Sequence, residues 1–293
     1  MRSELARVDA MTGRIEASQL FTGSIHQVLE ARGSLWAVAE SSSTAATETL
    51  LRLNPGTLRV SRRQRVGIGG EYPWAAQILV VAAGWLWAAG GDRLLRVSLR
   101  TGAITASIVL PEAASSDVSA NAAGTVLIVG AADVGGRGTV QRRDPSTGRL
   151  LASHRVEGVA APTVAGPAGS AVWISEATGM MGYVQRLDAA SLRAEGSTCE
   201  EGRLTATCVP GTNGISAHIA SGLLWITQAN GGRQRNYCAD PVSGLVLASI
   251  RLPRPTQDIV LGIAADRIFY AAPGVRAGEF LRQEPAPSAC RAA

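Results

Sequence analysis

One short segment recurs along the whole chain at nearly constant intervals. Aligning residues 5–9 (LARVD) with its later copies places one residue of each copy in a common column, and successive members are 45, 44, 46, 44, 52 and 44 residues apart. The members of this arginine column are Arg7, Arg52, Arg96, Arg142, Arg186, Cys238 and Arg282. A fixed period of this length is the signature of a repeat protein, in which each repeat is one supersecondary unit packed against its neighbours.

Each period contains the pattern of four short strands. Residues 84–102 (GWLWAAGGDRLLRVSLRTG) hold an apolar run ending on Trp87, a Gly-Gly-Asp turn, an alternating strand around Arg96, and a Thr-Gly turn. A last short strand closes on a serine: Ser18, Ser61, Ser107, Ser153, Ser197 or Ser249. The apolar runs share a position for a large side chain: Trp36, Trp87, Leu127, Trp173, Trp225 and Phe269. The two-residue alternation and the turn glycines exclude helical repeats of similar length.

A repeat of about 46 residues with four strands predicts a β-propeller in which each repeat is one blade. We expect an all-β fold and a single domain over residues 1–293, and the hydrophobic content of 46% excludes a disordered chain. The third strand occurs seven times but the inner, tryptophan-bearing strand six times. Six blades, or a seven-bladed ring missing its first inner strands, fit this count. We favour the second, with residues 5–21 and 259–284 meeting at one blade.

The two recurring columns have structural explanations. A tryptophan recurring once per blade is expected to fill the wedge between twisted neighbouring sheets. A recurring arginine on the third strand is expected to be solvated near the rim, or paired with an aspartate. Neither column is therefore predicted to be a functional site.

The charge pattern argues against two classes of partner. The formal net charge is +5, and all 28 positive charges are arginines because the chain contains no lysine. No basic run is interleaved with aromatic residues, so nucleic-acid binding is not predicted. Two uncharged windows, residues 74–91 and 158–175, are long enough for a membrane span. Both contain glycines and a repeat tryptophan, Trp87 or Trp173, so we expect buried hairpins and no span.

Several segments resemble known propeller repeats. Residues 5–18 (LARVDAMTGRIEAS) and 140–153 (VQRRDPSTGRLLAS) resemble YVTN-type and pyrroloquinoline-quinone-type repeats, and residues 169–176 (GSAVWISE) and 221–228 (SGLLWITQ) resemble the blade motif of streptogramin lyases of the virginiamycin B lyase type. The resemblance covers essentially the whole chain and implies the fold. The quinone-type repeat carries a tryptophan where this chain has serines, at Ser18, Ser107 and Ser153, so no cofactor is expected.

The resemblance to streptogramin lyases implies an alternative function. Those enzymes hold a divalent metal between histidines and an acidic residue near the central face. Of the three histidines here, His26 and His218 lie in predicted first strands near the central channel, whereas His154 follows an outermost strand. Glu40 and Glu176, just past a tryptophan strand, are the candidate carboxylates. Because these residues fall in different blades, structural roles are favoured, and a metal-dependent enzyme acting at the central funnel is the alternative.

The four cysteines bear on the compartment. They allow three connectivities. Cys199 and Cys208 lie close together within the one 52-residue period, whereas Cys238 replaces an arginine of the column and Cys290 lies in the rim region of the next blade. Local placement therefore favours Cys199 with Cys208 and Cys238 with Cys290. Disulfides persist in oxidising compartments, so we expect an extracellular or cell-envelope protein, although this chain carries no signal peptide.

The leading hypothesis is a non-catalytic module that binds a ligand or protein in the cell envelope, as a scaffold or as the sensor portion of a larger protein. The candidate contact residues are the aromatics outside the columns, Tyr72, Trp74 and Trp85, on a loop face shared with the insertion at residues 199–208. Glu40, Glu176, His26 and His218 are secondary candidates. The expected partner is a protein, peptide or glycan, and we expect a monomer.

Overall fold

The computed structural model describes residues 2–9, 12, 14–40, 48–66, 79–111, 113, 115–121, 123–133, 137–156, 163–178, 181–195, 215–220, 222–230, 233–250, 259–264, 267–271, 282–285 and 290. These residues form 24 β-strands and no α-helix. The contacts divide the chain into two compact units: Met1–Val134 with Asp144–Arg149, and Gly135–Arg143 with Leu150–Ala293.

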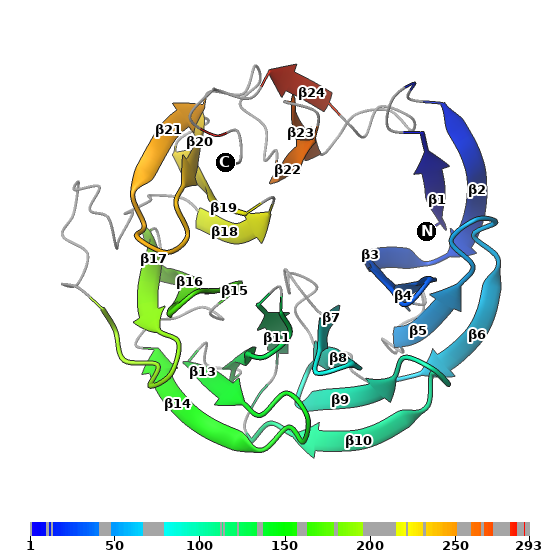
Figure 1. Cartoon of the computed structure of the whole chain (residues 1–293), viewed down its shortest axis with the longest axis horizontal. Helices are drawn as coiled ribbons and strands as arrows, with labels where there is room; N and C mark the ends of the chain where they lie inside the picture. Colours follow the sequence, from blue (N-terminus) through cyan, green and yellow to red (C-terminus); the bar gives the residue numbers. More distant parts are fainter. Residues whose placement is uncertain are drawn as a thin grey trace. The chain divides into compact units, whose positions relative to one another are not determined.

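The first unit is built from hairpins whose strands follow the chain in order (Figure 1). Alternating apolar residues face a neighbouring sheet, and short turns allow antiparallel pairing. Its strands are β1 (Arg2–Val8) and β2 (Ile15–Thr22); β3 (Ser24–Ala31), β4 (Ser34–Glu40), β5 (Glu48–Leu53) and β6 (Val60–Arg65); β7 (Leu79–Ala82), β8 (Trp85–Gly90), β9 (Arg93–Ser98) and β10 (Ile104–Val109); and β11 (Ser115–Ala120) and β12 (Leu127–Ala132).

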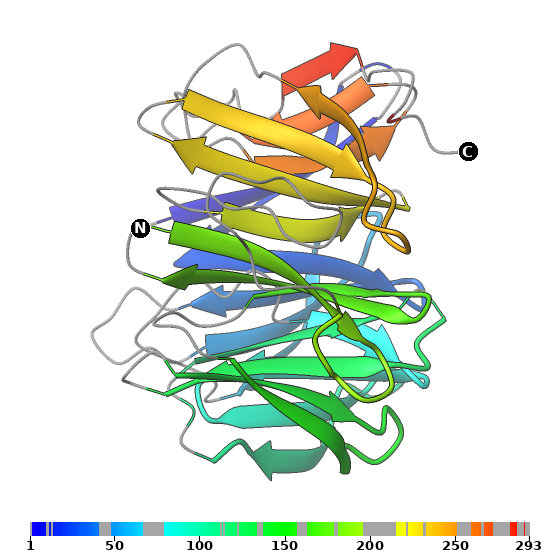
Figure 2. The same ribbon diagram turned by 90° about the vertical axis from the view of Figure 1, so that its left-hand side faces the viewer.

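The second unit follows the same plan. Its strands are β13 (Gly138–Arg143) and β14 (Leu150–Val156); β15 (Thr163–Ala168), β16 (Ala171–Thr178) and β17 (Met181–Asp188); β18 (Ile215–Ala220), β19 (Leu223–Asn230), β20 (Arg233–Ala239) and β21 (Val246–Ile250); and β22 (Ile259–Ala264), β23 (Arg267–Ala271) and β24 (Arg282–Pro285). The yellow-to-orange sheet β18–β21 is seen with its strands running in alternating directions in Figure 2.

The sheets reproduce the predicted repeat. The third strand of the repeat is β1, β5, β9, β13, β17, β20 and β24, and the tryptophan-bearing strand is β4, β8, β12, β16, β19 and β23. The described strands form four four-stranded, two three-stranded and one two-stranded sheet. The choice between six and seven blades, and the meeting of the terminal segments at one blade, remain predictions.

The tryptophan column forms the core between sheets. Trp36, Trp87, Trp173 and Trp225 are buried. Trp36 of β4 packs in one cluster with Leu86 and Leu95 of the next sheet, and Trp87 of β8 packs in another with Val118 and Val129. Trp36, Trp87 and Trp173 thus fill the space between their own sheet and the following one, as predicted.

Three column positions inferred from the sequence are displaced. Leu127 is the first residue of β12 and packs in the cluster around Trp87. It does not occupy the tryptophan position, because a turn of six residues separates it from its partner Ala120. Ser61 lies at a β-bulge and does not occupy the place of the other serines, which Arg63 takes. In the last repeat Phe269 pairs with Gln283, so the arginine column passes through Gln283 and not through Arg282.

The two uncharged windows around Trp87 and Trp173 were predicted to be hairpins, and they contain the antiparallel pairs β7–β8 and β15–β16. No helix in the described part of the chain is long and apolar enough to cross a bilayer.

Candidate functional site

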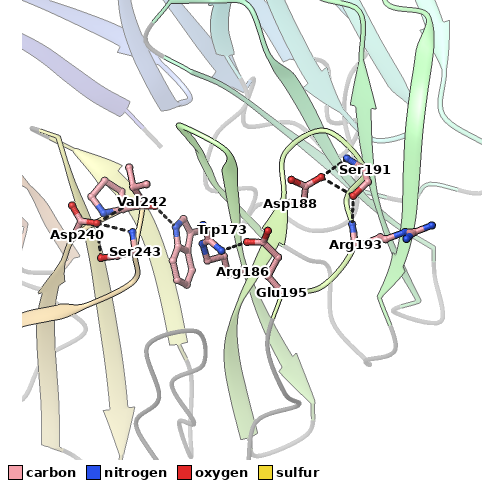
Figure 3. Close-up of polar contacts among 10 residues, drawn as sticks. Trp173, Arg186, Asp188, Ser191, Arg193, Glu195, Asp240, Val242 and Ser243 are labelled. Atoms are coloured by element: carbon pink, nitrogen blue, oxygen red, sulfur yellow. Dashed lines mark hydrogen bonds and ion pairs between the residues drawn. The ribbon is translucent and has the colours of Figure 1, made fainter.

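The turn after each third strand is closed by one polar side chain. Asp144 Oδ1 accepts hydrogen bonds from the backbone N–H groups of Ser146 and Thr147, at 3.0 and 2.8 Å, and from both of their hydroxyls. The same side-chain cap is made by Asn54, Asp188 and Asp240 in their turns, as Figure 3 shows for Asp188 and Asp240. This is the Asx-turn preference of Asp and Asn; in the turn after β9, Ser98 takes the same place and accepts from the Thr101 N–H.

These hydrogen bonds stabilise the charged form of the carboxylates. The hydroxyl of Ser146 and the N–H of Thr147 hold the pKa of Asp144 well below its ordinary value. Hydrogen bonds from Ser191 lower the pKa of Asp188, and hydrogen bonds from Ser243 lower the pKa of Asp240. A carboxylate that accepts several N–H and O–H bonds resists protonation for this reason.

The backbone carbonyls of these turns accept hydrogen bonds from the preceding sheet. Trp87 Nε1 donates to the Pro145 carbonyl at 3.0 Å, and Trp173 Nε1 donates to the Pro241 carbonyl at 2.7 Å (Figure 3). Each tryptophan therefore both fills the interface and positions the next turn.

The arginine column also connects neighbouring sheets. Arg52 donates to the Arg100 carbonyl and Arg142 to the Ala190 carbonyl, both at 3.0 Å, and Arg96 donates to the Ser146 carbonyl. Arg186 instead pairs with Glu195 (Figure 3). The first three are part-exposed, and their partners are backbone carbonyls and not aspartates, because the next turn presents carbonyl acceptors within reach of each guanidinium.

Cys238 occupies the arginine column in structure as well as in sequence. It lies opposite Trp225, as Arg52 lies opposite Trp36. It forms the predicted disulfide with Cys290, with the two Cα atoms 5.9 Å apart and both residues fully buried. The predicted pair Cys199–Cys208 lies outside the described residues.

Trp85 has a structural environment. It is half-buried at the start of β8, packs beside the Trp87 cluster, and carries the Arg96 guanidinium 4.5 Å from its ring centroid. Tyr72 and Trp74 lie outside the described residues, in the segment that leads into Leu79. Trp85 pairs with Ala82, at the opposite end of β7 from Leu79. The expectation that Trp85 shares a loop face with Tyr72 and Trp74 therefore stays a prediction.

The histidine and glutamate candidates are divided between the units. In the first, His26 lies at a bulge of β3, and Glu40 ends β4 opposite Ser24, so both are at one end of the same sheet. In the second, Glu176 of β16 pairs with Tyr183, and the half-buried His218 of β18 pairs with Trp225. Among the described residues, no group of three His, Cys, Asp or Glu side chains is placed to hold a metal ion.

Two features of the structure were not predicted from the sequence. The first is a polar inner strand: in β11, Ser116, Asp117 and Ser119 are buried, with Asp117 opposite Gly130. Four polar residues in a six-residue inner strand (SSDVSA) were the available signal.

The second missed feature is the set of outer strands. Strands β2, β6, β10, β14 and β21 each end their sheet, and we call their unpaired borders the outer edges. Many residues along them or directly before them are exposed, and several of these are apolar: Ile15, Leu20, Val109, Leu150, Leu151, Leu245 and Leu247 are 36–62% exposed. Because four of these five strands expose apolar side chains, and exposure alternates along β10 and β21, the outer edges are the candidate interaction surface.

Comparison with solved structures identifies the architecture. BamB from Moraxella catarrhalis superposes with a TM-score of 0.54 at 12% sequence identity, over 92% of this chain and 76% of that one. Hydrazine synthase from Kuenenia stuttgartiensis superposes with a TM-score of 0.59 at 12% identity, over 83% and 71%. The fold is a β-propeller. Both neighbours have quinoprotein-like propeller folds, which confirms the predicted resemblance for the fold. No protein-family model and no curated protein matches the sequence.

Proposed function

We propose that this β-propeller is a non-catalytic polypeptide-binding module of the cell envelope, which captures extended segments at its outer edges. The observation that carries the proposal is the row of exposed side chains along strands that end their sheets. A strand at a sheet edge has unpaired N–H and C=O groups and is a template for another strand, and proteins commonly block such edges with charges or proline.

Two of the five outer strands in the described part of the chain lack such protection. Strand β10 (ITASIV) has no charged residue, and β21 (VLASI) has none either. Leu247 of β21 and Leu245, which directly precedes this strand, are exposed. Addition of a peptide strand would pair the backbone groups and cover these side chains, which is how several binding domains recognise extended segments.

The disulfide supports the location. Cys238–Cys290 joins β20 to a residue 52 positions later. Disulfides of this kind persist in extracellular and envelope compartments and are rare in reducing cytosol. An envelope module that meets other chains there, as a scaffold or as the sensor portion of a larger protein, is consistent with both observations.

Hydrogen–deuterium exchange with a panel of unstructured peptides tests the proposal, because peptide addition slows exchange of the amides that it pairs. We expect at least one peptide to protect an outer strand, β10, β14 or β21 among them. Turnover of a substrate that requires a divalent metal and is lost in His218→Ala would contradict the proposal and favour the lyase-like enzyme.

A further inference from the structure

Strand β6 departs from the other outer strands at equivalent positions. In four outer strands an alanine lies opposite the column residue and a serine follows it: Ala17-Ser18, Ala106-Ser107, Ala152-Ser153 and Ala248-Ser249. In β6 the same register places Arg62 opposite Arg52 and Arg63 opposite Leu51. Arg65, two residues further along, occupies the position of Val109 in β10.

The three arginines of β6 are in different situations. Arg62 donates to the Thr101 carbonyl and so belongs to the contacts with the next turn. Arg63 and Arg65 are exposed, and neither guanidinium forms an ion pair or hydrogen bond with another residue in the part of the chain that the structure describes. Other arginines, such as Arg7 with Glu16 at 3.0 Å, do have carboxylate partners. Arg63 and Arg65 thus present two uncompensated charges on an open edge.

The spacing of these charges matches a strand. Residues two apart in a strand lie on the same side, about 7 Å from each other, so Arg63 and Arg65 can face side chains two apart in an added strand. Guanidinium groups bind carboxylates through paired hydrogen bonds. We propose that the outer edge of β6 binds an extended acidic polypeptide segment, which pairs with the strand and places alternate carboxylates on Arg63 and Arg65. This inference rests on the proposed function and assigns the partner class for one edge.

Two simpler explanations fit less well. Charges can merely block an edge, but then the uncharged edges β10 and β21 would need them equally. A single-stranded nucleic acid would also attract arginine, but its binding sites usually offer aromatic side chains for the bases to stack on, and β6 (VSRRQR) has none. Main-chain pairing also requires a polypeptide.

The test uses the full chain and a fluorescent peptide of about eight alternating threonine and glutamate residues, slightly longer than a typical strand. Anisotropy gives the affinity, and hydrogen–deuterium exchange locates the peptide. Two probes serve as comparison: a threonine–glutamine peptide of the same length and a single-stranded oligothymidylate of the same charge.

Two variants exploit the repeat. Arg63→Ser with Arg65→Val gives β6 the residues that β10 has at the same positions, Ser107 and Val109. Conversely, Ser107→Arg with Val109→Arg transfers the two arginines to β10. Arg59→Ser with Arg149→Ser is the charge-matched control, because both arginines are exposed and lie outside the outer strands. Thermal melts confirm that each variant is folded.

We expect the acidic peptide to protect β6 and to bind the Arg63→Ser, Arg65→Val variant at least about tenfold more weakly, a loss that the control does not show. The transferred arginines should bring protection to β10. The inference would be overturned if the Arg63→Ser, Arg65→Val variant bound the acidic peptide as tightly as the natural chain, or if the natural chain bound the glutamine peptide as tightly as the acidic one. Tighter binding of the oligothymidylate without protection of β6 would also overturn it. If neutral peptides protect β14 or β21 but the acidic one leaves β6 unprotected, this inference fails and the proposed function stands. Protection of no outer strand by any peptide contradicts both.

Discussion

At the scale of single residues, the contact between a tryptophan and the next turn depends on the absence of a side chain. A Cβ added at Gly148 would lie 2.9 Å from Trp87 Cη2, and one at Gly102 would lie 3.4 Å from Trp36 Cη2. In two other repeats the same turn position holds a leucine, Leu58 or Leu192, also at positive φ. In both cases the preceding repeat has no tryptophan at the column position. The turn residue therefore varies with the preceding repeat.

Gly148→Ala should be costly for two reasons. The φ of +78° is unfavourable for a side chain, and the new Cβ would also lie 2.2 Å from Ile108 Cδ1. We expect a loss of about 3 kcal/mol in the free energy of unfolding, measured with urea. Gly33→Ala is the matched control, because its φ is +67° with no atom within 4 Å, and it should cost about 1 kcal/mol. Equal losses would show that the tryptophan contact does not constrain this turn.

The turn carboxylates predict how stability depends on pH. Hydrogen bonds lower the pKa values of Asp144, Asp188 and Asp240 in the folded state. The unfolded chain therefore binds protons first as the pH falls through the ordinary value of about 3.9, and the free energy of unfolding falls with it. Above that pH the contribution is fully present.

Changing all three residues to asparagine tests this explanation. Asn54 makes the same cap without a charge, so the triple variant should fold. Between about pH 5 and pH 3 its free energy of unfolding should fall less than that of the natural chain. Parallel curves for the two proteins would indicate that other groups determine the acid sensitivity. Chemical denaturation at a series of pH values provides both curves.

At the scale of elements, one position of the third strand forms long-range contacts in several repeats. In three repeats the contact is a hydrogen bond from arginine to a turn carbonyl, and at Cys238 it is covalent. Replacing Cys238 and Cys290 by alanine removes a link that closes a segment of 52 residues.

We expect this replacement to lower the free energy of unfolding by about 2–4 kcal/mol. Reductant should produce a similar loss in the natural chain and no change in the variant, as followed by urea unfolding. Identical unfolding curves for the two proteins would mean that the disulfide does not contribute to stability.

At the scale of the whole molecule, the repeat was readable from the sequence because blade packing requires the same residue types at the same places. Trp36, Trp87, Trp173 and Trp225 are buried where the period placed them. The partners of the arginines were not readable, because the acceptors are backbone carbonyls, which carry no residue signature. Leu127 was wrongly assigned to the tryptophan position, because the longer turn between β11 and β12 shifts the strand without changing the period of the repeat. The outer edges were missed because exposure depends on which strand ends a sheet.

The last prediction concerns how the molecule unfolds. The chain passes between the two units three times, since Asp144–Arg149 belongs to the first unit and lies between β13 and β14 of the second. Within each unit, neighbouring sheets share apolar clusters, and repeats stabilised by such interfaces unfold cooperatively when the coupling between them is strong.

We therefore expect one calorimetric transition, with a van't Hoff enthalpy equal to the calorimetric enthalpy, as for a single domain. Fluorescence of Trp87 and of Trp225, each followed in a variant in which the other five tryptophans are replaced by phenylalanine, should report the same midpoint, because the two residues belong to different units. Two separate midpoints would show that the units are independent domains, contrary to the prediction of a single domain over residues 1–293.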